Sequence, residues 1–195
     1  MQILPALSRA RFSILTMAAA YLLSCFAGAA LIHHGSPFAL RNRDNIVGAA
    51  QSSAILTQLN VGHPLRAAAL DFAGNLVAGT SSGLLGLFPP MGYGAALLRG
   101  WVGGIVSVDG DHHSRLLSTR SGIYYLGVLL LQILPYSLVG GAGVNLGISL
   151  YRLTPHYSGP RRWSFPIEAL RDALRIYVLT IPLFLIASLI EFYFA

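Results

Sequence analysis

The sequence predicts an all-α fold, a polytopic transmembrane helical bundle that forms one integral membrane domain over residues 1–195. Of the residues, 54% are hydrophobic and only 10% are charged, and the mean hydropathy is +0.62. A soluble domain spends about a quarter of its residues on Asp, Glu, Lys and Arg. The apolar residues also gather in runs long enough to cross a bilayer. These observations exclude a disordered chain, a coiled coil and a collagen-like fibre.

The first predicted span covers residues 12–32 and contains no charged residue. At about 1.5 Å per residue it crosses roughly 30 Å of hydrocarbon. A cleaved signal peptide is the competing interpretation, because Leu22-Leu23-Ser24-Cys25 resembles a lipoprotein cleavage box. The apolar run continues well past Cys25, which favours an uncleaved anchor.

Four further spans are predicted over residues 66–88, 91–106, 122–151 and 173–194. Pro89-Pro90 separates the second from the third, because consecutive prolines lack amide donors and oppose helix continuation. The run 122–151 is interrupted by Pro135 and several glycines. It is either one kinked helix or a hairpin of two half-helices, so the bundle has five spans or six.

A weakly amphipathic helix is predicted over residues 45–60, after the first span, with Asp44 as its N-cap. It lies on the membrane surface or is a plain helix within a loop. In the five-span arrangement seven arginines fall on the side of the N-terminus and five on the other side. This bias favours a cytoplasmic N-terminus. We expect the chain to lie in the cytoplasmic membrane of a prokaryote.

Polar residues within the predicted spans are the main functional candidates, because charges inside a bilayer are costly. One interpretation is a buried polar network that lines a pathway or a partner-binding cleft. The alternative is ordinary helix-packing contacts together with side chains that extend to the interface. The residues are Asp71, Asn75, Arg99, Asn145 and Glu191.

Glycines recur at the spacing of close helix contacts, which is typical of tight bundles in lipid. The three pairs are Gly79 with Gly83, Gly100 with Gly104, and Gly143 with Gly147.

Motifs for catalysis or cofactors are weak. Residues 79–83 match G-x-S-x-G, but a serine nucleophile needs a strand-to-helix turn and a histidine base. No histidine lies inside a predicted span, so haem ligation is disfavoured as well. We therefore expect no enzyme activity and no cofactor. We also expect no nucleic-acid partner, because the arginines are scattered. Weak metal candidates, set against ordinary loop histidines, are His33, His34, His112 and His113.

Three segments between about residues 65 and 195 resemble the stage II sporulation protein M family of small polytopic membrane proteins. They are LDFAGNLVAGT at residues 70–80, LLRGWVGG at 97–104 and IPLFLIASLIE at 181–191. The chain departs from the family at polar positions: Arg99 stands where Asn is usual, and residues 134–137 replace a Pro-His-Gly segment that is followed by Glu. A role for those positions in the family therefore does not transfer directly.

The resemblance implies a helical bundle without enzyme activity of its own. In sporulating bacteria such a protein scaffolds peptidoglycan-degrading partners at the engulfing membrane. The leading functional hypothesis is thus a membrane scaffold or accessory subunit, in contact with lipids and other membrane proteins or in a homo-oligomer. The alternative is a transporter or permease-like subunit with a polar site at broken helices.

Overall fold

The computed structural model describes residues 3–151 and 166–193, and these residues form helices and no strand. This confirms the all-helical prediction. A 3₁₀ turn, η1 (Arg115–Leu117), precedes α6. The α-helices are α1 (Ile3–His33), α2 (Pro37–Gln51), α3 (Ala54–Asn60), α4 (Pro64–Gly86), α5 (Pro89–Ile105), α6 (Thr119–Leu150) and α7 (Ile167–Tyr193).

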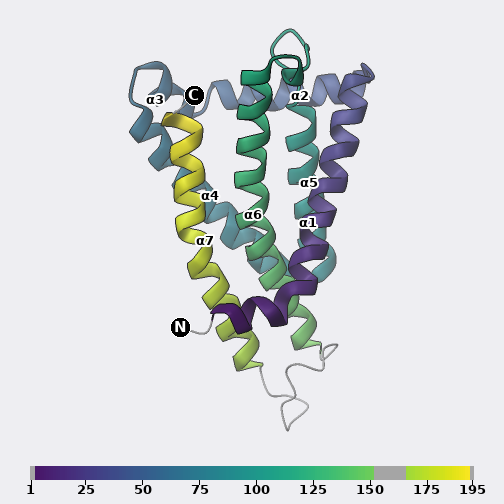
Figure 1. Cartoon of the computed structure of the whole chain (residues 1–195), viewed down its shortest axis with the longest axis vertical. Coiled ribbons are helices and arrows are strands. Elements are labelled where there is room, and N and C mark those ends of the chain that lie inside the picture. Colours follow the sequence, from purple (N-terminus) through teal and green to yellow (C-terminus); the bar gives the residue numbers. More distant parts are fainter. Residues whose placement is uncertain (1–2, 152–165, 194–195) are drawn as a thin grey trace.

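Five long helices run up and down through the molecule, and the two termini lie at opposite ends (Figure 1). Helices α1, α5 and α7 lead toward the end that carries α2, while α4 and α6 run the other way. Helix α2 lies across that end of the bundle. We call it, together with the loop between α5 and α6, the cap.

Three of the described helices, α1, α6 and α7, are long and apolar enough to cross a membrane. Helices that could cross a membrane, by their length and composition, are therefore present as predicted. Helices α4 and α5 run beside them, but α5 has only 17 residues. The structure thus supports three of the five predicted spans by length and hydropathy.

The hairpin alternative for residues 122–151 is wrong, because α6 is one continuous helix of 32 residues that contains Pro135. Its glycines do not break it. The four glycines after Pro135 are buried, and they let neighbouring helices approach: a methyl group built on Gly143 would collide with the backbone of Gly83 in α4. Because these glycines serve helix contacts, the glycine-rich sequence gives a tightly packed helix and no unwound segment.

The helix predicted over residues 45–60 is also wrong in its bounds. Helix α2 begins at Pro37, a residue suited to a first turn, and ends at Gln51. Ser53 then caps a separate helix, α3, by accepting a hydrogen bond from the amide of Leu56. Asp44 lies in the middle of α2 and is not an N-cap, because the helix starts two turns earlier than its sequence pattern indicates.

Candidate functional site

A chain of hydrogen bonds joins α4, α6 and α7 within the bundle. The Asp71 carboxylate accepts hydrogen bonds from Asn75 and from Ser188, each at 2.7 Å. The Tyr136 hydroxyl donates to the side-chain oxygen of Asn75 at 2.6 Å. Each group thereby meets the hydrogen-bonding needs of its neighbour, as buried polar groups must. The sequence predicted Asp71 and Asn75, and the structure adds Ser188 and Tyr136.

Arg99 joins this chain through an aromatic ring and not through a carboxylate. Its guanidinium carbon lies 3.7 Å from the centre of the Tyr136 ring, which is cation–π geometry. Among the described residues, all the ion pairs are formed by other basic residues, and none includes Arg99. A direct pair with Asp71 or Glu191, which its long side chain allowed, is not formed.

Glu191 lies one helical turn beyond Ser188 in α7. Gln132 donates to its carboxylate at 3.0 Å, and Tyr124 donates to its backbone oxygen at 2.7 Å. Asn145 is separate: it lies nine residues after Tyr136 in α6, about 13 Å further along the helix. The structure therefore places four of the five predicted residues in one region and leaves Asn145 outside it.

We expect Asp71→Ala to destabilise the bundle by about 1–3 kcal/mol, because Asn75 and Ser188 lose their shared acceptor. Asp71→Asn keeps one acceptor oxygen and should lose less. The thermal unfolding midpoint in detergent micelles measures both. Equal midpoints for wild type and Asp71→Ala would show that these hydrogen bonds do not hold the helices together.

A cleft of about 500 Å³ opens beside this region, between α1, α5, α6 and the end of α7. Apolar side chains form much of its wall, together with three tyrosines. Its charged and amide side chains are Arg99, Arg115, Gln132 and Glu191. A second pocket, of about 10 Å³, shares Tyr21 and Arg99 with the lining of the cleft and also includes Tyr136 and Ser137. Arg99 therefore borders both spaces.

The six predicted packing glycines all lie at contacts between helices. Methyl groups built on Gly100 and Gly104 would collide with the backbone oxygens of Tyr21 and Cys25, so α5 packs directly on the backbone of α1. Gly83 and Gly143 are each other's neighbours across α4 and α6. Built methyl groups would lie 2.8 Å from the Phe184 ring at Gly79 and 2.5 Å from the Leu87 oxygen at Gly147.

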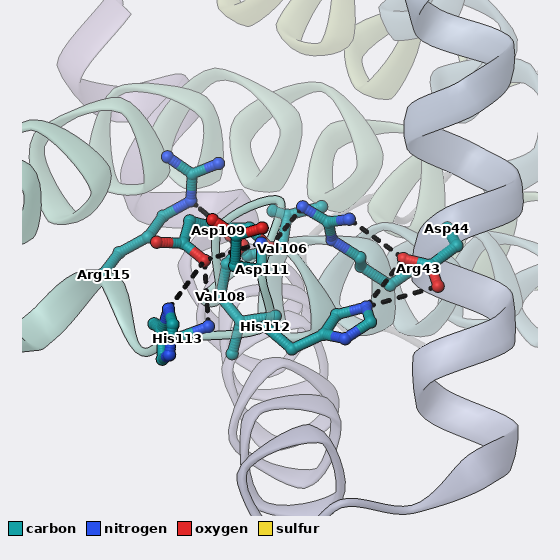
Figure 2. A network of polar contacts seen from close by, with 9 residues as sticks. All are labelled: Arg43, Asp44, Val106, Val108, Asp109, Asp111, His112, His113 and Arg115. Atoms are coloured by element: carbon teal, nitrogen blue, oxygen red, sulfur yellow. Dashed lines mark hydrogen bonds and ion pairs between the residues drawn. The ribbon is translucent and has the colours of Figure 1, made fainter.

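Figure 2 shows the polar network of the cap. The buried Arg43 side chain donates to the Asp44 carboxylate at 2.9 Å and to the backbone oxygen of Asp109 at 2.6 Å. His112 also lies 3.0 Å from the Asp44 carboxylate. Arg43 and Asp44 therefore fasten α2 to the loop that connects α5 with α6. The contacts between α2 and the loop were not predicted from the sequence, because Arg43 and Asp109 are 66 positions apart, and Asp44 and His112 are 68 positions apart.

Acid should loosen the cap. The hydrogen bond from His112, and secondly that from Arg43, hold the pKa of Asp44 below its ordinary value. A carboxylate with a lowered pKa contributes stability above its ordinary pKa, near 4, and that contribution is lost as the pH falls further. The Trp163→Phe variant leaves Trp101 as the one tryptophan of the chain, and Trp101 donates a hydrogen bond to Asn42 of α2. In this variant we expect the fluorescence emission of Trp101 to change below about pH 4. Asp44→Asn should reduce this change, and identical acid profiles would contradict the assignment.

The four weak metal candidates separate in the structure. His33 is bonded to Ala29 and Ser114, His112 faces Asp44, and His34 is exposed. Only His113 lies in a group of potential ligands, with Asp109 and Asp111. Asp109 already accepts backbone hydrogen bonds from residues 111 and 113, which lower the pKa of its carboxyl, so the geometry supports a structural role in closing the loop.

The G-x-S-x-G match lies within α4, in its last third. The Ser81 hydroxyl donates to the backbone oxygen of Val77 at 2.9 Å, within the same helix. Such a segment has no sharp strand-to-helix turn to present a nucleophile.

No family model, no curated protein and no solved structure matches the chain.

Proposed function

We propose that the chain is a non-enzymatic integral membrane scaffold or accessory subunit that assembles with partner proteins. One observation carries this proposal: an apolar groove of about 400 Å³ lies between α4, α6 and α7, on a part of the bundle separate from the polar cleft. Gly83 and Gly143 contribute to its lining, and Leu84 and Leu174 are more than half exposed beside it.

Such a groove suits a transmembrane helix of a partner. In lipid, helices associate through close packing, and small residues allow their backbones to approach. The resemblance to the stage II sporulation protein M family, whose members organise partner proteins, supports the same conclusion.

The structure gives less support to a transport function than to a scaffold function. A permease-like site was expected at broken helices, but α6 is continuous.

A bulky residue in the groove tests the proposal. Leu174→Trp should abolish the stoichiometric association of a partner after extraction in a mild detergent. Leu185→Trp is the matched control, because Leu185 is also exposed on α7 but does not line the groove. Mass spectrometry and light scattering measure partner identity and stoichiometry.

A wild-type chain that elutes alone or as a homo-oligomer, and that makes liposomes permeable to a solute, would refute the scaffold proposal in favour of transport.

A further inference from the structure

The polar cleft has the character of a ligand site. Its volume of about 500 Å³ falls within the range of small-molecule sites, which combine apolar walls with a few placed polar groups. It lies toward the cap end of the bundle, because its lining comes mostly from the second half of α5, the first half of α6 and the end of α7.

Arg99 provides a positive charge in the lining of the cleft. It is six residues from the end of α5, about 9 Å along the axis, and it is supported by the Tyr136 ring. Charged residues inside membranes normally pair with an opposite charge. All seven acidic side chains of the sequence belong to the described residues, and none of them forms an ion pair with Arg99.

Arg115 provides a second positive charge, from η1 beside the membrane helices. Its Nε donates to the backbone oxygens of Val106 and Val108, at 3.0 and 3.2 Å, and this fixes the side chain. Its two outer nitrogens point away from the rest of the cap network (Figure 2). Within the described part of the chain they have no hydrogen-bond partner, so they remain available to an acceptor in the cleft.

Glu191 and Gln132 form the opposite side of the cleft. Gln132 donates to one carboxylate oxygen of Glu191, which leaves the other oxygen to accept from a hydroxyl or ammonium group. The cleft therefore holds two cations against one acid, next to a pair that can bind a neutral hydroxyl.

We propose that this cleft binds a phospholipid by its phosphate, which lies between Arg115 and Arg99, while the hydroxyl-bearing headgroup faces Gln132 and Glu191. Guanidinium groups match phosphate oxygens with paired hydrogen bonds. Basic pockets between transmembrane helices are known sites for lipid headgroups. A lipid supplies phosphate at this depth, and its acyl chains pack against the apolar wall and the surrounding bilayer. The excess positive charge selects an anionic lipid over a zwitterionic one.

Titration of the purified full chain in a neutral detergent tests this inference. The probes are dihexanoylphosphatidylglycerol, dihexanoylphosphatidylcholine and inorganic phosphate, with native mass spectrometry as the readout. Of the three probes, dihexanoylphosphatidylglycerol should bind most tightly. Arg115→Gln should raise its Kd at least tenfold, or about 1.4 kcal/mol. Arg99→Gln should do the same in fractions that elute as folded protein.

Arg41→Gln is the matched control, because Arg41 is exposed on α2 at the same end of the molecule but does not line the cleft. It should bind the lipid as wild type does. Equal affinity of wild type and Arg115→Gln would overturn the proposal. If inorganic phosphate binds as tightly as the lipid, the ligand is a soluble phosphate compound and not a lipid. If dihexanoylphosphatidylcholine binds as tightly as dihexanoylphosphatidylglycerol, the cleft has no preference for an anionic headgroup. None of these outcomes depends on the groove between α4, α6 and α7.

Discussion

Gly143→Ala is expected to destabilise the bundle by about 2–3 kcal/mol, near the upper end of the usual effect of overpacking. The added methyl group would collide with the backbone of Gly83, and a backbone cannot turn aside as a flexible side chain can. Helices α4 and α6 would have to move apart, which would also disrupt the chain of hydrogen bonds that includes Asn75 and Tyr136.

Gly127→Ala is the matched control, since Gly127 lies in the same helix and nothing is within 4 Å of the added methyl group. Alanine is a better helix former than glycine, so this variant should gain up to about 1 kcal/mol. Thermal unfolding midpoints in detergent micelles should therefore move in opposite directions for the two variants. A midpoint for Gly143→Ala at or above that of wild type would show that α4 and α6 are not in direct backbone contact.

Asp172→Ala, near the start of α7, should have a comparable effect. The Asp172 side chain is 1% exposed and accepts two hydrogen bonds from Arg9 of α1, at 2.6 and 2.8 Å, and one from Arg175. Removal of one partner from a buried pair costs about 3–5 kcal/mol. The Arg9 side chain is 32% exposed and regains water, so we expect about 2–3 kcal/mol.

The pair between Glu168 and Arg171 provides the control on the same helix. Both side chains are 60% exposed, and such surface pairs contribute at most about 1 kcal/mol. Glu168→Ala should therefore leave the unfolding midpoint nearly unchanged. Equal midpoints for the two variants would contradict the inferred role of Asp172 as the link between α1 and α7.

The helices were predictable because apolar runs and prolines are local signals. Pro89 and Pro90 mark the start of α5, and residues 66–88 correspond closely to α4. The hairpin alternative for α6 failed because a glycine has two opposite uses, as a helix breaker and as a close-contact residue. Only the neighbour decides between them, and the neighbour of Gly143 is Gly83, 60 positions earlier in the chain.

The candidate site was predictable only in part, for a related reason. A charge in an apolar run is visible in the sequence, so Asp71, Arg99 and Glu191 were found. Their partners were not, because Ser188, Tyr136 and Gln132 are ordinary residues for a membrane helix. These residues become partners because of the way α4, α6 and α7 face one another, and the sequence pattern of a single helix does not reveal that arrangement.

The bond between Arg9 and Asp172 joins residues that are 163 positions apart. At about 5–20 residues per second, a ribosome needs roughly 8–33 s to make the second partner after the first. For the first part of that interval α5, whose Gly100 and Gly104 pack on the backbone of α1, has not yet been made, and α7 is completed only after Asp172. The contact between the first and the last helix therefore forms late, after all the helices between them have been synthesised.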